Sequence, residues 1–285
     1  MKSLVIGASG QVGEHFLEAA GPETTGTYLR HARPGLIPLN IEDLRQFHDV
    51  VAQTKPDVIY LMACQANVDY CETHPEAAWQ TNVGGARNAV ELANEFRCKL
   101  VFFSSEYIFD GAAGPYAEDA TVNPICEYGR QKAAAEQLIT AGANHWLIIR
   151  TAGVYSWESQ GKNFIYRLLG ALRGNTTIEV PSDQFSTPTY APDLVRAVMQ
   201  LVELDMRGVF NVAGSRVANR YEFAVAAARH FGLSSRFIAP VTTSKLSQAA
   251  RRPLNAGLIV EKSERALSRR LLDFETGLRE MACVS

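Results

Sequence analysis

The chain has 285 residues, of which 47% are hydrophobic and 20% charged, and this is long enough to bury a substantial core. The formal net charge of −2 gives no support for a nucleic-acid or anionic membrane partner, and no apolar run approaches a membrane span. Five scattered cysteines lack any metal-ligand spacing and indicate a reducing compartment, so we expect a cytoplasmic protein without a metal site.

The first predicted element is a short buried strand at 3–6, followed by the glycine-rich run GASGQVG and a helix. Gly7, Gly10 and Gly13 form a GxxGxxG pattern between that strand and that helix. In this context glycines allow a tight turn, a close approach of backbone to a pyrophosphate, and close packing of helix on strand. The helix N-terminus also offers N–H groups and a positive dipole end to phosphates. We therefore predict a dinucleotide site that includes Gly7, Gly10, Gln11 and Val12.

A second strand is predicted at 24–30, beside the first, and it leads into the basic run RHAR at 30–33. Sites for NAD usually carry an acid at this point, whereas sites for NADP bring an arginine to the 2′-phosphate. The lack of an acid favours NADPH bound through Arg30, with NADH as the alternative cofactor. An exposed basic loop without a cofactor role is the other interpretation of the same run.

Three more apolar strands are predicted at 58–62, 99–104 and 145–150, with helical stretches between them, and Asn82 falls within one of these helices. This alternation predicts an α/β fold with a doubly wound parallel sheet, the NAD(P)-binding Rossmann fold, over residues 1–150. A return strand near 208–213 interleaves it with a smaller C-terminal substrate lobe at 151–285. Further cofactor contacts are expected at Asn40 and Ile41, which could flank an adenine, and at Ala63 and Cys64, near the sugar–phosphate.

The stretch from 103 to 132 carries the candidate chemistry. Tyr128 and Lys132 lie four residues apart in a run of good helix formers, so they share one face of a helix. A neighbouring ammonium group lowers the pKa of a phenol from its usual value near ~10. With Ser105 holding a carbonyl, the three side chains suit reduction of a ketone or oxidation of an alcohol by a hydride-carrying cofactor. A tyrosine and a lysine on an ordinary amphipathic helix are the alternative, because YxxxK alone is common.

The chain resembles the extended short-chain dehydrogenase/reductases in six motifs: GASGQVG, ANVDYCETHPEAAWQTN, SSEYIFDG, YGRQK, SDQFSTPTYAPDL and RRPLNAGL. Within that superfamily it most resembles the dTDP-4-dehydrorhamnose reductase family, which also includes the regulatory β subunit of methionine adenosyltransferase. The resemblance covers nearly the whole chain. It implies NADPH-dependent reduction of the C4 keto group of a nucleotide-linked 4-keto-6-deoxy sugar. Ser105, Tyr128 and Lys132 are the implied catalytic residues, with Tyr128 as the proton donor and Lys132 lowering its pKa.

One departure from the family concerns the sugar site. The chain reads RTAGVYS where the family commonly reads RTSWVYG, so Gly153 stands where a tryptophan would lie against the sugar. Either Tyr155, Trp157 or Phe185 replaces that aromatic wall, or the glycine answers a backbone requirement. Serine at 105 and glutamate at 106 replace the usual threonine and aspartate. The substrate-binding residues that the resemblance implies are Val68, Glu106, Tyr107, Gly153, Gln184, Arg252 and Asn255.

Two interpretations without catalysis stand beside the reductase. The run YLRHARP resembles the basic cofactor loop of the β subunit, which favours a regulatory protein that binds NADP without turnover. A cofactor-free scaffold on the same fold is the other interpretation, and the intact glycine motif argues against it. The expected partners are a nucleotide-sugar substrate but neither nucleic acid nor a membrane, and the sequence leaves room for a homodimer.

Overall fold

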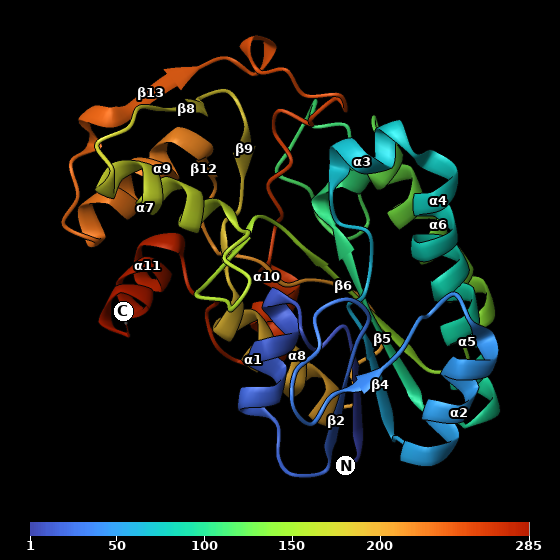
Figure 1. The fold of residues 1–285 in the computed structure, drawn as a ribbon. Coiled ribbons are helices and arrows are strands. Elements are labelled where there is room, and N and C mark those ends of the chain that lie inside the picture. Colours follow the sequence, from blue (N-terminus) through green and yellow to red (C-terminus); the bar gives the residue numbers. More distant parts are fainter. Residues whose placement is uncertain (285) are drawn as a thin grey trace.

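The centre of the protein is a seven-stranded parallel sheet, seen in a computed structural model that describes residues 1–284 (Figure 1). Its strand order is β3-β2-β1-β4-β5-β6-β11. The chain therefore moves outward in one direction from β1 to β3 and in the other from β4 to β11, which confirms the predicted doubly wound fold. The strands are β1 (Ser3–Ile6), β2 (Thr24–Tyr28), β3 (Ile37–Pro38), β4 (Val58–Leu61), β5 (Lys99–Ser105), β6 (Trp146–Thr151) and β11 (Gly208–Asn211).

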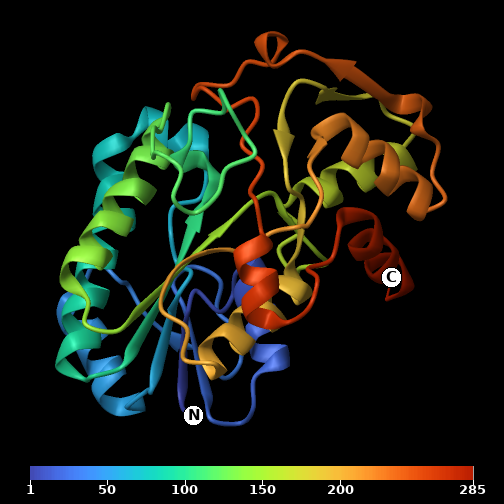
Figure 2. The same cartoon turned by 180° about the vertical axis from the view of Figure 1, so that it is seen from behind.

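Helices cover both faces of the sheet, as the continuous apolar strands require. On one face α1 (Gln11–Ala19) packs against α8 (Ala191–Glu203) over a buried cluster that includes Val5 and Val101. On the other face a second cluster, which includes Leu4 and Ile59, is covered by α2 (Leu44–Thr54), α5 (Gly85–Glu95) and α6 (Glu127–Gly142). Figure 2 shows the sheet from behind, with α5 and α6 along one side.

Two differences from the predicted elements bear on the site. The second strand ends at Tyr28, so Arg30 lies in the loop after β2 rather than in the strand. Asn82 lies in a π-helical turn, Gln80–Gly84, between α4 (Pro75–Trp79) and α5, and not in a regular helix. In that wider turn its side chain accepts a hydrogen bond from Gln65 N at 2.7 Å and donates one to Gln131 Oε1 at 2.7 Å. The turn thus ties the loop after β4 to the helix that carries Tyr128.

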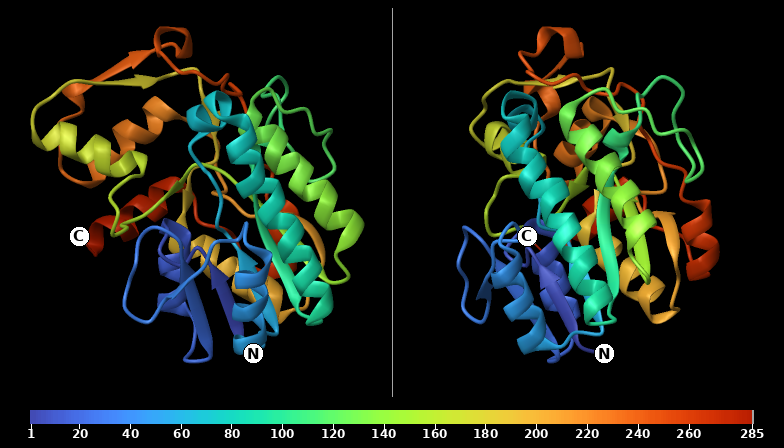
Figure 3. Two further views of the ribbon diagram at one scale, coloured as in Figure 1. Left: turned by 45° about the vertical axis from the view of Figure 1, so that its right-hand side comes forward. Right: turned by 90° about the vertical axis from the view of Figure 1, so that its right-hand side faces the viewer.

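Most of the chain after β6 forms a smaller lobe beyond the carboxyl ends of the central strands (Figure 3). Its core includes Leu168, Phe223 and Leu278, one from each of α7 (Phe164–Arg173), α9 (Arg220–His230) and α11 (Phe274–Cys283). Three two-stranded sheets complete it: β7 (Val154–Tyr155) with β10 (Thr189–Tyr190), β9 (Phe185–Ser186) with β12 (Ala218–Asn219), and β8 (Ile178–Pro181) with β13 (Ile238–Val241).

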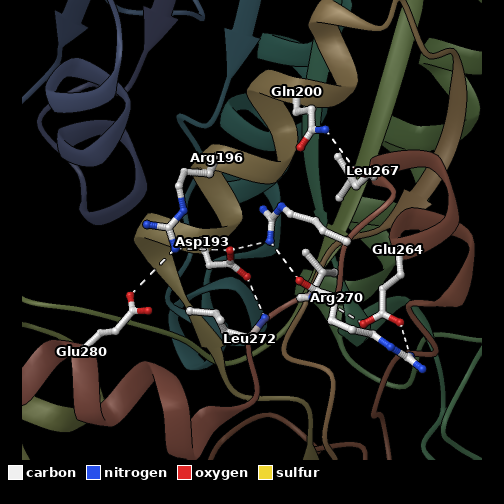
Figure 4. Close-up of polar contacts among 10 residues, drawn as sticks. Asp193, Arg196, Gln200, Glu264, Leu267, Arg270, Leu272 and Glu280 are labelled. Carbon is white, nitrogen blue, oxygen red and sulfur yellow. Dashed lines mark hydrogen bonds and ion pairs between the residues drawn. The ribbon is translucent and has the colours of Figure 1, made fainter.

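The C-terminal segment returns from the lobe to the sheet and is anchored at the start of α8. The buried carboxylate of Asp193 accepts hydrogen bonds from Arg269 Nη1 at 2.9 Å and from Leu272 N at 2.9 Å (Figure 4). Helix α10 (Glu261–Leu267), just before these residues, packs on α8 and β11. The anchor therefore fixes the segment that connects the sheet with α11 in the lobe.

Among the described residues, 1–284, no helix combines the length and the apolar character that crossing a lipid bilayer requires. Nor do three His, Cys, Asp or Glu side chains of that range gather closely enough to hold a metal ion.

Candidate active site

The turn after β1 allows a ligand to approach the backbone closely. Gly7 has a φ of +90°, and a Cβ there would lie 2.9 Å from Ala63 N. A Cβ on Gly13 would overlap the Gly7 carbonyl, so this glycine lets α1 begin directly against the turn. The N-cap residue of α1, Gly10, makes no side-chain capping bond. The first N–H groups of the helix therefore remain available to an anion.

A cavity of about 480 Å³ opens beside this turn. Asn40 is the one predicted cofactor residue that does not line it: its side-chain oxygen accepts a hydrogen bond from Glu42 N at 3.1 Å and stabilises the loop before α2. All the other predicted cofactor residues line the cavity, namely Gly7, Gly10, Gln11, Val12, Arg30, Ile41, Ala63, Cys64, Tyr128 and Lys132.

Several polar groups of this cavity are free to bind a ligand. The hydroxyl oxygens of Ser104 and Thr151 are buried in its lining and have no hydrogen-bond partner among residues 1–284. Buried polar atoms are normally satisfied, so both favour a polar ligand here. Arg30 is exposed at the rim with no ion-pair partner in the described range, whereas Arg33 pairs with Glu14 at 3.2 Å. These groups fit a dinucleotide whose pyrophosphate lies on the glycine turn.

Tyr128 and Lys132 lie on one face of α6, as predicted, and both line this cavity. Lys132 Nζ donates a hydrogen bond to Phe103 O at 2.7 Å and lies 5.8 Å from the centre of the Tyr128 ring. The Tyr128 side chain lies close enough to Ser105, at the end of β5, for the serine hydroxyl to act to lower the pKa of the phenol.

The expected lowering of the pKa of Tyr128 does not appear in the structure. Burial, and after it the nearby Cys64 and Glu106, raise the pKa of Tyr128 well above its usual range. The ammonium group of Lys132 is directed to the Phe103 carbonyl and does not outweigh burial. Tyr128 therefore keeps its proton at neutral pH, which is the state that a proton donor requires.

A second cavity, of about 320 Å³, lies between the end of β5 and the lobe. Of the predicted substrate residues, Glu106, Tyr107, Gly153 and Gln184 line it. Val68 and Arg252 line an adjoining open groove, which shares Tyr107 and Gln184 with the cavity. Asn255 lines neither, because its side-chain amide donates to Gly114 O at 2.8 Å and stabilises the loop that follows Asp110.

Glu106 is a buried carboxyl group at the junction of β5 and this second cavity. Burial raises the pKa of Glu106 to about 7, although hydrogen bonds from Ser105 and from the Gly153 backbone oppose the shift. The charge of Arg220 opposes it as well. Burial also raises the pKa of Tyr107 to about 12. Glu106 can thus change its protonation state near neutral pH while both tyrosines remain neutral.

Two arginines in the second cavity were not predicted from the sequence. Arg220, the first residue of α9, lies over the Phe164 ring at 4.5 Å, and Arg167 comes from α7. Burial lowers the pKa of Arg220. Within residues 1–284 neither guanidinium forms an ion pair with a carboxylate, so both are available to an anionic ligand. The capping box formed by Asn219 and Glu222 was a visible signal for the start of α9, but local sequence could not place that start beside β5.

The structure shows why glycine stands at position 153 and which nearby aromatic side chain could contact a sugar in place of the tryptophan. Gly153 has a φ of +47°, which bears out the backbone requirement. Phe185 lines the cavity and is 38% exposed, so it is free to contact a ligand. Tyr155 also lines it, but its ring is buried and its hydroxyl donates to Phe274 O at 3.1 Å. Trp157 is not among the lining residues of either cavity, since its Nε1 donates to Met281 O at 2.9 Å.

Comparison with known proteins places this geometry in a family. The family profile described as RmlD substrate binding domain matches residues 1–284. The chain belongs to the RmlD substrate binding domain family. This confirms the family that the motifs of the sequence had indicated.

Individual relatives are similar over nearly the whole chain. Methionine adenosyltransferase 2 subunit beta of Mus musculus is 29% identical over 287 residues, which cover 97% of this chain and 86% of that protein. dTDP-4-dehydrorhamnose reductase of Sinorhizobium fredii is 29% identical over 296 residues, covering 99% and 96%. The crystal structure of dTDP-4-dehydrorhamnose reductase from Bacillus anthracis in complex with NADP superposes with a TM-score of 0.91, at 26% identity and with 100% of both chains covered.

Proposed function

We propose that the protein reduces the C4 keto group of a nucleotide-linked 4-keto-6-deoxy sugar, with NADPH as the preferred cofactor. The observation that carries the proposal is the position of Tyr128. It lines the first cavity, and its side chain lies beside Ser105, whose neighbours Glu106 and Tyr107 line the second. A proton donor in the cavity beside the glycine turn is thus two residues' reach from a second cavity that holds two unpaired arginines. The relatives named as dTDP-4-dehydrorhamnose reductases, among them one in complex with NADP, support the same activity.

In this mechanism bound NADPH supplies the hydride that reaches C4. Tyr128 is neutral and donates its phenolic proton to the ketone oxygen, which completes the alcohol. Lys132 has three N–H donors, of which Phe103 O takes one, so the others can hold the ribose hydroxyls. Its positive charge also limits the cost of the phenolate that remains on Tyr128 after the transfer. Arg167 and Arg220 bind the diphosphate of the sugar nucleotide.

The proposal is tested by turnover on defined substrates. The purified protein is mixed with NADPH and a panel of dTDP-, UDP- and GDP-linked 4-keto-6-deoxy sugars, and both NADPH oxidation and the reduced sugar are measured. We expect one NADPH to be consumed for each sugar reduced. A protein that binds NADPH but oxidises it with no member of the panel would contradict the proposal.

A second candidate is a regulatory subunit that binds NADP without turnover. The observation in its favour is the similarity to the mouse β subunit, which covers 97% of this chain. Capture of a methionine adenosyltransferase catalytic subunit, together with no turnover on any sugar nucleotide, would support it. Absence of NADP(H) binding in calorimetry would instead support the cofactor-free scaffold.

A further inference from the structure

The hydroxyl group of Ser105 already takes part in two hydrogen bonds. It donates a hydrogen bond to Glu106 Oε2 at 3.0 Å and accepts one from Tyr107 N at 3.2 Å. The side chain of Tyr128 lies nearby, and the Ser105 hydroxyl acts to lower its pKa. A serine hydroxyl carries a single proton that it can donate. If Ser105 is to polarise a substrate ketone, the ketone oxygen and the carboxylate of Glu106 compete for that proton.

We infer that Glu106 is a positioning residue that controls the reduction. Its protonation state determines whether Ser105 donates its proton to the Glu106 carboxylate or to the ketone oxygen. The inference rests on the proposed function, in which a ketone oxygen binds beside Tyr128. When Glu106 is ionised, its Oε2 accepts the Ser105 proton and the ketone is bonded by Tyr128 alone. When Glu106 is protonated, its own O–H donates to Ser105 Oγ, which also accepts from Tyr107 N–H. Ser105 then has both lone pairs occupied and its proton free for the ketone.

The surroundings of Glu106 let it exchange between these two states. Its side chain is 6% exposed, at the end of β5 where the lobe closes over it. The groups that face it are the Ser105 hydroxyl, the Gly153 backbone, the phenols of Tyr107 and Tyr128, and the guanidinium of Arg220. The other cations that line the same cavity are Lys162 and Arg167. Burial outweighs the hydrogen bonds from Ser105 and the Gly153 backbone and the charge of Arg220, all of which favour the carboxylate, and raises the pKa of Glu106 to about 7.

In this scheme the enzyme is active when Glu106 is protonated. Reduction is fastest below the pKa of Glu106 and slows as pH rises through it. Well above the pKa, the protonated fraction of any single group falls tenfold for each pH unit. Tyr128 has a pKa raised far above this range, so it does not contribute to the same decline.

The decisive experiment measures kcat at saturating NADPH and sugar between about pH 6 and pH 9 for the wild type and three variants. Glu106→Gln does not titrate and can donate an amide N–H to Ser105, so its kcat should stay constant over this range. Glu106→Asp is one methylene shorter and should show a weaker pH dependence than the wild type. Ser105→Ala lacks the contested proton, so its low kcat should no longer depend on Glu106, and adding Glu106→Gln should leave its profile unchanged.

An infrared titration supplies a readout that needs no turnover. We expect the carbonyl band of a protonated carboxyl group in the wild type, lost as pH rises through about 7 and absent in Glu106→Gln. A wild type without turnover would overturn the proposed function, and the infrared titration would still test the state of Glu106. A carboxylate that stays ionised from pH 6 upward would overturn the inference. So would turnover with the same pH profile in the wild type and Glu106→Gln, and that result would leave the proposed function standing.

Discussion

The two cavities of this protein are built in different ways. The first is formed by the ends of the central strands and by the backbone of a glycine turn, with nearly all of its lining between residues 6 and 132. The second is formed by side chains from stretches scattered between residues 106 and 256. The carboxyl ends of parallel strands meet at one edge of the sheet, so the first cavity follows from the fold itself. The second cavity depends on how the lobe packs against the end of β5. Substitutions in it can therefore change substrate specificity without changing cofactor specificity.

This contrast predicts separable effects. Substitutions in the first cavity should change cofactor affinity, and substitutions in the second should change the affinity for the sugar nucleotide. Tyr128 lines the first cavity next to Ser105, and its substitution should change turnover alone.

Replacing Tyr128 with phenylalanine should have the largest effect. The variant lacks the donated proton, and general acid catalysis of this kind contributes ~10²–10⁴-fold to the rate. We expect kcat to fall by that factor while NADPH affinity, measured by fluorescence titration, remains near the wild-type value. A parallel loss of affinity and rate would show that Tyr128 supports the structure of the first cavity instead.

Arg220→Met should weaken sugar-nucleotide binding next. A charge-assisted hydrogen bond is worth ~1.5–3 kcal/mol, so the Kd of the sugar nucleotide should rise ~10–150-fold, with NADPH affinity unchanged. Methionine keeps an apolar stem over the Phe164 ring. Arg236→Met is the matched control, because Arg236 lies over the Phe237 ring at the same 4.5 Å but lines neither cavity. Equal effects of the two variants would mean that Arg220 acts through stacking and stability.

The same contrast explains what the sequence could predict. Glycine spacing, apolar strands and the YxxxK spacing are local signals, and they identified every strand of the central sheet except β3. All predicted cofactor residues except Asn40 line the first cavity, but other lining residues, such as Ser104 and Thr151, were not predicted. Asn40 and Asn255 were assigned to ligands, but Asn40 bonds within its own loop and Asn255 bonds to the separate loop at Gly114, choices that depend on backbone geometry. Arg220 was missed because its place beside β5 results from packing of the lobe. Burial of Tyr128, which reverses the expected direction of its pKa shift, likewise depends on tertiary structure.

Arg30→Ala should shift cofactor preference by a smaller factor. Only NADPH carries the 2′-phosphate, and an exposed charge-assisted contact lies at the lower end of the usual range, about 1.5 kcal/mol or roughly tenfold. We expect the ratio of NADPH to NADH affinity to fall by that factor in calorimetry. Arg33→Ala is the matched control, because Arg33 is already paired with Glu14 at 3.2 Å. An unchanged ratio in Arg30→Ala would show that this loop does not face the cofactor.

Gly153→Trp tests whether the second cavity can be returned to the usual family form, and its expected effect is the smallest. The φ of +47° at Gly153 strains any other residue by about 1–2 kcal/mol, so the melting temperature should fall. Gly153→Ala carries the same strain, and its Cβ would meet Ser186 Oγ and Pro188 Cα only at ordinary contact distances of 3.5 and 3.6 Å. The difference between the two variants therefore isolates the ring, which should add ~0.5–1.5 kcal/mol of contact with a sugar, or roughly 2–10-fold in kcat/KM. We expect wild-type kcat/KM on dTDP-4-dehydrorhamnose to be low relative to the best sugar nucleotide, and tryptophan to raise it above the alanine variant. High wild-type efficiency on dTDP-4-dehydrorhamnose would refute this, because Phe185 and its neighbours would then already supply the missing wall.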